Sequence, residues 1–376
     1  MNTKRNGAID FLRFFFCILI VLRHSVHALP EDTTLVMPGG AMGVEFFFVV
    51  SGYLLACSAY KRVNNGNPIN TAEDTNIFMK NKLRSFSTEL VVASVFSMII
   101  YPLTLIPQGP YEILVDFAKK IWNPLLLSAA GFGVTNEIWY LSAMIIIMLA
   151  FYPLLIKFFN SFVRIVAPLI AIFVLGYLSN AFTSLLDPSY FTGLLYKGMI
   201  RAIGEIALGV AIFPLIQALS KPSLTKRAKT LVTVGAFLSI IFAYLIIQFR
   251  SDKKLDFLCL LFITTGVILT FSHQGILADK FDNKVSFWLG KISLPLYLSH
   301  RWLALSINNV YLYLCKINFY RFGESEKFDY FFILAVYLVG SVCSCTVIYL
   351  ISKYIRNHRE ELSAKFRRKY IAQSAD

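Results

Sequence analysis

The sequence predicts an all-α, polytopic integral membrane protein with about ten transmembrane helices and both termini in the cytoplasm. Three observations indicate this fold class. Of the 376 residues, 57% are hydrophobic and only 15% are charged, whereas an ordinary soluble domain has about 45–50% apolar and about 25% charged residues. Long apolar runs approach the roughly 20 residues that cross a bilayer as a helix. Lys and Arg are also distributed unevenly between alternate loops.

Six of the predicted spans are apolar runs without charged residues. They cover 90–111, 138–156, 165–186, 230–249, 257–278 and 330–352. Four further apolar segments contain charged residues, and these cover 8–29, 40–60, 199–219 and 286–306. An ionisable side chain inside a span is costly unless it is paired or hydrated, so such residues persist mainly where they have a function. The sequence therefore predicts that the chemistry lies in these four segments.

The basic residues predict the orientation in the membrane. With the N-terminus inside, ten spans place more than twice as many Lys and Arg on the inner loops and tail as on the outer loops. Cytoplasmic loops carry such an excess, so we expect a multi-pass protein of the cytoplasmic membrane. The net charge of +14 is then expected to face anionic membrane lipid, and nucleic-acid binding is not expected.

The chain is predicted to divide into a membrane domain, 1–352, and a basic tail, 353–376, that forms a short cytoplasmic helix near the headgroups. Residues 121–136 are uncharged, but they are few and are broken by one proline and two glycines. We expect them to form an interfacial or re-entrant segment on the outer side. The six Cys lack the spacing of a zinc site or a disulfide framework, so no metal is predicted.

Two polar residues of the first span share one helix face. Arg13 and His24 are eleven residues apart, which is three helical turns plus about 20°, and roughly 16 Å along the axis. They would line one track, with Arg13 towards the cytoplasm and His24 towards the outer side. The structural alternative is that Arg13 reaches the inner headgroups and His24 bonds a backbone carbonyl. A metal pair of His24 with His27 is not favoured, because no further ligands complete it.

The second span carries a single carboxylate, Glu45, among phenylalanines. The small residues before it permit close helix packing, but a carboxylate in an apolar span needs a partner or a function. A carboxylate that orients or charges a histidine is the arrangement that general-base catalysis uses. We therefore hypothesise that Glu45 pairs with His24 as a second catalytic residue.

Five motifs occur in an order that is found in a known family. They are Arg13-x10-His24, GVEFFFVVSGY (43–53), WYLS (139–142), Arg201-x3-Glu205-x3-Gly209 and LGKISLPLYLSH (289–300). This series resembles membrane acyltransferase family 3, the bacterial integral-membrane O-acyltransferases of surface glycans. The resemblance extends over roughly residues 5–305.

The resemblance implies ten helices and transfer of an acyl group, expected to be acetyl, from cytoplasmic acetyl-CoA. The acceptor would be a hydroxyl of an extracytoplasmic or lipid-linked polysaccharide, and no permanently bound cofactor is implied. His24 receives the role of catalytic base and Arg13 a role in handling the donor. The other motif residues receive substrate-contacting or supporting roles, and they are Tyr53, Trp139, Arg201, Glu205, Tyr297 and His300.

Structural explanations stay open for several of these residues. Arg201 and Glu205 are four residues apart and can form an ion pair within one helix. Trp139 begins a span, where an aromatic belt accounts for it. For His300, a hydrogen-bonded helix end is as well supported as a substrate contact.

The chain departs from the family in the loop after the second span. The family usually has an arginine pair followed by proline there, whereas this sequence has Lys80, Lys82 and Arg84 without a proline. Positive charge for the phosphates of CoA is kept, and these three residues are the predicted donor-binding set. Many members also append an extracytoplasmic esterase-like domain that delivers acyl groups onward. Here transfer is expected either to finish in the membrane domain or to use a separate acyl-relay or glycan-assembly partner.

Two other function classes were weighed against acyl transfer. A proton-coupled transporter or exporter of a glycan precursor would use intramembrane Glu and His, but such proteins commonly show internal repeats with paired broken helices, and this sequence shows none. A non-catalytic partner of a glycan synthase is the third class. Thermal protection of the protein by acetyl-CoA would separate the first class from both others.

Overall fold

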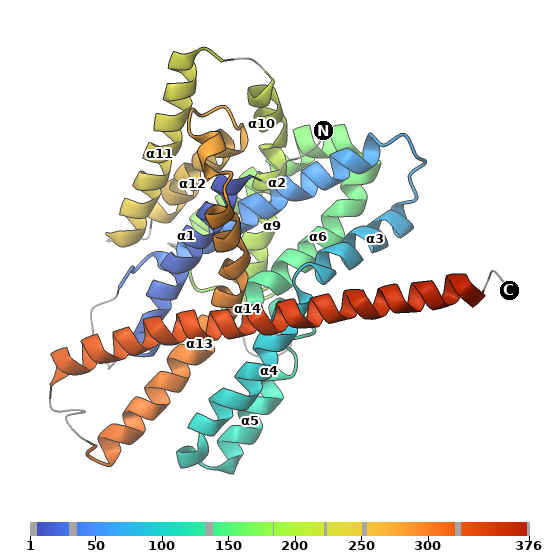
Figure 1. Ribbon diagram of the computed structural model, residues 1–376. Helices are drawn as coiled ribbons and strands as arrows, with labels where there is room; N and C mark the ends of the chain where they lie inside the picture. The colour runs from blue at the N-terminus through green and yellow to red at the C-terminus, as the bar shows by residue number, and fades with distance from the viewer. Residues whose placement is uncertain are drawn as a thin grey trace.

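The computed structural model describes residues 6–29, 36–131, 138–182, 184–221, 224–249, 254–319 and 325–373. Helices make up nearly all of its regular structure, which confirms the predicted all-α class (Figure 1). The first half contains α1 (Gly7–His24), α2 (Gly43–Val63), α3 (Thr71–Arg84), α4 (Ser87–Thr104), α5 (Pro110–Lys120) and α6 (Trp139–Lys157). The second half contains α7 (Phe159–Ser161), α8 (Ala167–Ala181), α9 (Lys197–Ala211), α10 (Phe213–Ser220), α11 (Lys226–Gln248), α12 (Leu255–Phe271), α13 (Lys284–Lys316) and α14 (Glu326–Gln373).

Every predicted span coincides with a helix, but the apolar lengths differ. Within the described ranges, seven helical segments are long and apolar enough to cross a membrane. They are Gly40–Val63, Ser87–Thr104, Trp139–Lys157, Phe159–Ala181, Lys197–Ser220, Lys226–Gln248 and Lys327–Arg359. The helix α12 is apolar but shorter, and α1 and α13 are interrupted by charged residues. A multi-pass membrane protein is supported, whereas the count of ten and the orientation of the termini stay predictions.

The segment before α6 is not a spanning helix where the structure describes it. Residues 121–131 consist of turns and one short 3-10 helix, Ser128–Ala130. The rest of the predicted interfacial or re-entrant piece lies outside the described residues. The preceding helix α5 exposes Tyr111, Leu114 and Phe117, which recur at helical spacing. Such an amphipathic helix is typical of a membrane interface.

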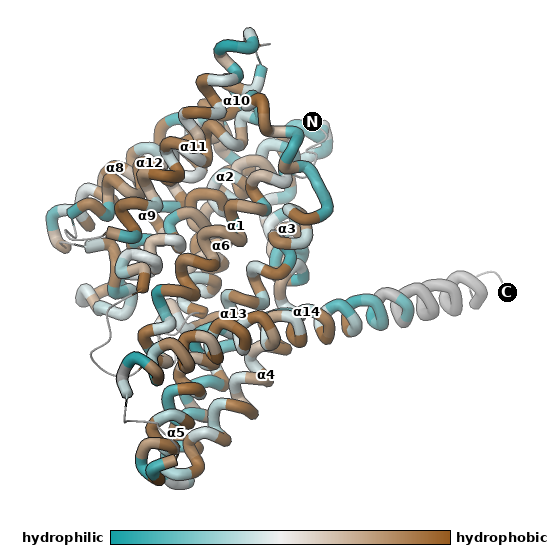
Figure 2. Tube along the Cα trace, turned by 60° about the vertical axis from the view of Figure 1, so that its left-hand side comes forward, coloured by the Kyte–Doolittle hydropathy of each residue, from teal (hydrophilic) through white to brown (hydrophobic). Residues whose placement is uncertain are grey.

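The helices differ strongly in how much of their surface is covered. In Figure 2, hydrophobic residues extend along most helices and hydrophilic residues gather at their ends and in the loops. Of the best apolar window in the segment that contains α2, 78% is buried, compared with 22% for α11. The helix α2 is therefore central, and α11 offers an apolar surface to lipid.

The central helices approach each other through glycines. A Cβ atom on Gly52 of α2 would collide with the carbonyl oxygen of Ile206, and one on Gly209 of α9 would collide with the carbonyl oxygen of Val49. Backbone contact of this kind is what small residues permit in membrane helices. It holds the buried polar residues of α2 and α9 side by side.

The helix α1 packs against α13 in a similar way. A Cβ on Gly290 would collide with the side chain of Asp10, and the thiol of Cys17 donates to the carbonyl oxygen of Ser293 at 3.1 Å. Asparagine side chains cap both helices, since Asn6 accepts from the amide of Ile9 and Asn283 caps α13 in the same manner. The pairing of α1 with α13 sets the two helices that carry the candidate histidines next to each other.

Candidate active site

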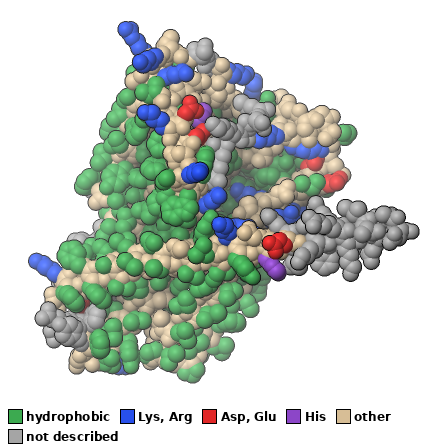
Figure 3. Space-filling view, viewed as in Figure 1, with side chains coloured by type: hydrophobic (Ala, Val, Ile, Leu, Met, Phe, Trp, Pro, Cys, Tyr) green, Lys and Arg blue, Asp and Glu red, His purple; other side chains and the backbone are tan. Residues whose placement is uncertain are grey.

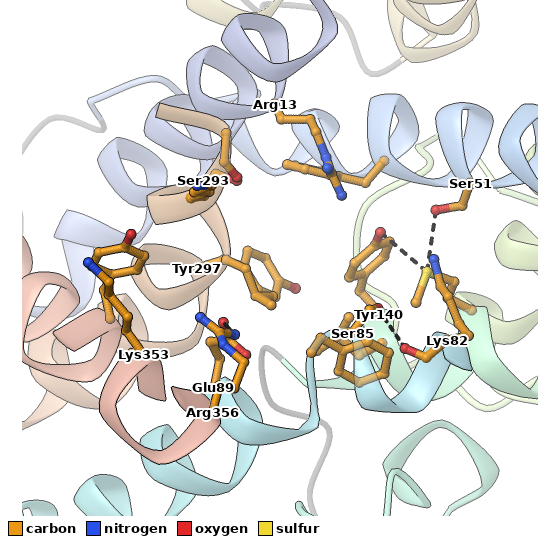
Figure 4. A pocket seen from close by; sticks show the side chains of 18 residues that line it. Arg13, Ser51, Lys82, Ser85, Glu89, Tyr140, Ser293, Tyr297, Lys353 and Arg356 are labelled. Atoms are coloured by element: carbon orange, nitrogen blue, oxygen red, sulfur yellow. Dashed lines mark hydrogen bonds and ion pairs between the residues drawn. The ribbon is translucent and has the colours of Figure 1, made fainter. Parts of the chain in front are cut away.

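A cavity of about 490 Å³ lies among α1, α2, α6, α13 and α14, next to the junction of α3 and α4. Its described lining includes five cationic side chains and a single carboxylate, Glu89. The cationic residues are Arg13, Lys82, Lys291, Lys353 and Arg356. Figure 4 shows Arg13, Lys82, Lys353 and Arg356 around the ring of Tyr297, which extends into the cavity. The cavity is therefore strongly electropositive at neutral pH.

Two of the five cations have an acidic neighbour among the described residues. The guanidinium of Arg356 donates to Oε1 of Glu89, and Arg13 lies 3.7 Å from Asp10 through Nη1 and Oδ1. Burial and, to a smaller extent, the nearby charge of Arg13 lower the pKa of Lys82 to about 8. A lysine held in this way is ready to bind an anion, because an incoming negative charge relieves both costs.

The predicted donor-binding set is only partly in place. Lys82 lines this cavity and also an adjoining one of about 400 Å³, which contains Ser58, Asp74 and Tyr152. Lys80 and Arg84 are exposed on α3 and are not among the lining residues of either cavity. A step of two residues along an α-helix turns the side chain by about 200°. Lys82 therefore points away from Lys80 and Arg84, and the three side chains cannot face one site together.

The remaining three cations were not predicted as site residues, although Lys291 lies in 286–306, one of the four segments in which the chemistry was predicted. Lys291 is in α13, and Lys353 and Arg356 are in the part of α14 that was predicted to be a tail. In Figure 3, Lys and Arg side chains gather in the strip between α3 and α14. Lys291 could have been predicted as a site residue, because it is a charged residue inside an apolar segment.

Three histidines lie close together and are not among the residues that line the cavity. The ring of His24, at the end of α1, is 4.8 Å from that of His300 and 5.6 Å from that of His27, between centroids. Nδ1 of His24 is 2.8 Å from the carbonyl oxygen of Ile20, and Nδ1 of His300 is 2.6 Å from that of Tyr297. A carbonyl oxygen only accepts, so each Nδ1 carries the proton and each Nε2 has a lone pair.

An aromatic side chain of the cavity also lies close to these histidines. Tyr297 lines the cavity and lies 5.5 Å from the ring of His300. Tyr140 and Phe47 also line the cavity, and their rings lie 5.8 Å and 6.5 Å from that of Tyr297. Tyr297 therefore connects the cavity that contains Arg13 to the histidines, and together with Phe47 and Tyr140 it forms an aromatic wall of this cavity.

Glu45 has a different partner from the one hypothesised. Its Oε1 accepts from Nη2 of Arg201 at 2.7 Å, and no hydrogen bond joins it to His24 within the described chain. Arg201 also donates through Nε to Glu205 at 3.2 Å, which is the ion pair weighed as the structural alternative. The guanidinium lies 5.5 Å from the ring centroid of Trp139. All three charged residues are buried, and the close approach of α2 to α9 explains their pairing.

Tyr53, predicted to contact or support substrate, lies away from both cavities, and the described chain also contains a group of metal-ligating side chains. Tyr53 is buried and packs on Phe271, with ring centroids 4.4 Å apart, and it is not among the residues that line either cavity. In the described part of the chain, one group of metal-ligating side chains, His273, Asp279 and Asp282, has ligand atoms within 4.8 Å of one another. It lies before α13, outside both cavities, and two of its members are exposed.

Comparison with known families decides between the function classes. A family model described as an acyltransferase domain, of acyltransferase family 3, matches residues 6–350. The chain belongs to this family. The resemblance seen in the motifs is thereby confirmed, and the family implies transfer of an acyl group from a donor to an acceptor. No curated protein and no solved structure matched the chain.

Proposed function

We propose that this family 3 acyltransferase moves an acyl group, expected to be acetyl, from cytoplasmic acyl-CoA to a hydroxyl of an extracytoplasmic or lipid-linked glycan. His24 serves as the general base. The observation that carries the proposal is the cavity lined by five cations and one carboxylate, whose aromatic wall contacts the histidine pair through Tyr297 and His300.

The charge of the cavity supports a CoA donor. Coenzyme A carries a diphosphate and a phosphomonoester, and Arg and Lys are the side chains that bind phosphate groups in proteins. Lys82 and Arg356 come from segments that the basic-residue distribution predicts to be cytoplasmic, which is where acyl-CoA is made. The adjoining second cavity shares Lys82 and Ser85 with the first. It offers further room for the nucleotide end of the donor.

The reaction needs a base, two positioned substrates and no redox step. Nε2 of His24 removes the proton of the acceptor hydroxyl, and the oxygen attacks the thioester carbonyl carbon. The C–O bond forms, the C–S bond breaks, and the proton passes from His24 to the departing sulfur. Arg13 at the cavity holds the donor, so that its acyl end is directed towards His24.

The aromatic wall limits which part of the donor can pass from the cation-lined cavity to the histidines. The thin pantetheine arm and acyl group of the donor would pass between Phe47, Tyr140 and Tyr297, while the charged nucleotide stays with the cations. The acceptor would approach from the side on which α1 ends at His24. Such a division keeps the charged part of CoA out of the apolar core.

Proton-coupled transport, the alternative considered from sequence, has less support. Such transport would need intramembrane Glu and His side chains to carry protons, but Glu45 and Glu205 both form ion pairs with Arg201. The ion pairs with Arg201 give both carboxylates a structural role that accounts for their presence without proton transport.

The proposal is tested by following the acyl group. Membranes that contain the protein are incubated with radiolabelled acetyl-CoA, and the envelope glycans are analysed by mass spectrometry for added acetyl groups. Acetylated glycan in wild-type membranes and none in membranes without the protein is the expected result. Unchanged glycan despite folded protein would contradict the proposal, and labelled lipid alone would assign a different acceptor.

A further inference from the structure

His300 has a buried ring nitrogen that the proposed mechanism does not use. The side chain is fully buried, and Nδ1–H is occupied by the carbonyl oxygen of Tyr297. Nε2 has no hydrogen-bond partner within the described residues. A buried polar atom without a partner is costly, so its presence calls for an explanation.

The ring that carries this nitrogen lies against the ring of His24. The two imidazoles are in contact, with centroids 4.8 Å apart and ring planes inclined by 67°. Two hydrogen bonds join α1 to its neighbours. The hydroxyl of Tyr337 in α14 donates to the carbonyl oxygen of Val21, and the thiol of Cys17 donates to the carbonyl oxygen of Ser293 in α13. The contact between the rings is therefore held by packed helices rather than by a loop.

His24 lacks the partner that a catalytic histidine usually has. In serine hydrolases a buried carboxylate orients the histidine and stabilises its protonated form. Here the orientation of His24 comes from the carbonyl oxygen of Ile20, and the carboxylate hypothesised for the task, Glu45, is bound to Arg201. Within the described chain no carboxylate forms an ion pair with His24. The titratable and charged neighbours that act on it are His300, Arg301 and His27.

We propose that His300 is a positioning residue that orients His24 and stabilises it while His24 is protonated. This proposal rests on the function proposed above. When Nε2 of His24 takes the proton of the acceptor hydroxyl, the His24 ring becomes positively charged, and the lone pair on Nε2 of His300, in the ring that contacts it, stabilises that charge. The proton then leaves His24 for the sulfur of the departing CoA. His300 gains and loses no proton, so the balance of the transfer reaction is unchanged.

Two variants separate this role from a structural one. In His300→Asn the side-chain amide can still donate to the carbonyl oxygen of Tyr297, but nothing occupies the place of Nε2. In His300→Gln the longer side chain returns an amide to that place, where its oxygen can accept a hydrogen bond. A purely structural His300 would be replaced well by Asn. An acceptor at Nε2 would be replaced better by Gln.

The experiment measures acetyl transfer from radiolabelled acetyl-CoA to the endogenous glycan of membrane vesicles, with rates normalised to folded protein. His300→Asn should lower the maximal rate at least about tenfold, since loss of the orienting partner of a catalytic histidine costs up to ~10⁴-fold. The KM for acetyl-CoA should stay within about twofold, because His300 is outside the donor cavity. His300→Gln should recover at least about threefold over Asn.

The control is His27→Asn, which changes the other histidine beside His24 and should leave the rate within about twofold. A wild-type rate in His300→Asn, equal losses in the Asn and Gln variants, or an equal loss in His27→Asn would each overturn the inference. If the Asn variant does not accumulate, a Gln variant with full loss of rate and unchanged acetyl-CoA binding likewise overturns it. Absence of transfer by the wild-type protein would instead contradict the proposed function itself.

Discussion

Arg201 of α9 donates to Glu45 of α2 across a distance of 2.7 Å, at a point where both side chains are completely enclosed. The same guanidinium binds Glu205. Two carboxylates thus share one cation in the apolar interior. Among the described residues, the second carboxylate oxygens of both Glu45 and Glu205 have no hydrogen-bond partner. This cluster joins two spans that are far apart in the chain.

We expect Glu45→Gln to destabilise the fold, because Arg201 then loses one of its two charged partners inside the protein. Breaking a buried ion pair by removing one partner costs about 3–5 kcal/mol, and the amide oxygen of Gln recovers part of that. Thermal unfolding in detergent should show a clear decrease in stability, and Glu205→Gln should behave similarly.

The rate per folded Glu45→Gln molecule then separates structure from catalysis. A rate within a few-fold of wild type agrees with the observed pairing to Arg201. A loss approaching ~10⁴-fold in stable protein would instead support the hypothesis that Glu45 acts on His24.

Lys82→Glu should raise the KM for acetyl-CoA at least about tenfold, because it places a negative charge in the wall of the donor cavity. Lys80→Glu is the matched control, since it makes the same change two residues away on the exposed side of α3. Initial rates over a range of acetyl-CoA concentrations measure both. Equal effects of the two substitutions would mean that the loop acts through general charge and that the cavity is not the donor site.

Donor binding should weaken as the pH rises above about 8. Lys82 has a pKa lowered to about 8 by burial, so it is charged below that pH and neutral above it. The Kd for acetyl-CoA should be flat below pH 7 and should rise by at most about tenfold per pH unit above 8 through loss of this one charge. The Lys82→Arg variant should show a flat profile over the same range, because Arg stays charged. A wild-type Kd that does not change between pH 7 and 9 would exclude Lys82 from phosphate binding.

The beginning of the predicted tail should contribute to donor affinity. Arg356→Ala should raise the KM for acetyl-CoA several-fold, because Arg356 lines the cavity. Arg359→Ala, an exposed position one turn further along α14, should not change it. An unchanged KM in Arg356→Ala would show that the ion pair with Glu89 fully occupies this side chain.

The spans could be predicted from the sequence because about 20 apolar residues in a row have few other uses. Their ends could not. The run 90–111 overshoots α4, which ends at Thr104. Gly109 takes a φ of 110° before Pro110 starts α5, and such a turn does not alter hydropathy. The run 330–352 stops short, because α14 continues through the charged residues to Gln373. Lys, Arg and Glu are good helix formers outside a membrane.

The site could be predicted only where its residues are close in the chain or stand alone in an apolar run. Arg13 was predicted from helical periodicity and Lys82 from charge, and both line the cavity, whereas the role of His24 stays a prediction. The partner of Glu45 could not be found, because Arg201 is 156 residues away and hydropathy carries no information on which helices touch. Arg356 was assigned to the headgroups for the same reason.

The central claim, that His24 is the base for acyl transfer, is tested most directly by the transfer rate of His24→Ala. The measurement is incorporation of radiolabelled acetyl groups from acetyl-CoA into envelope glycan, per amount of folded protein in the membrane. Thermal protection by acetyl-CoA reports in parallel whether the donor still binds. We expect His24→Ala to lose transfer while donor protection is kept, and His27→Ala to retain transfer within about twofold. Wild-type glycan acetylation by His24→Ala would contradict the account.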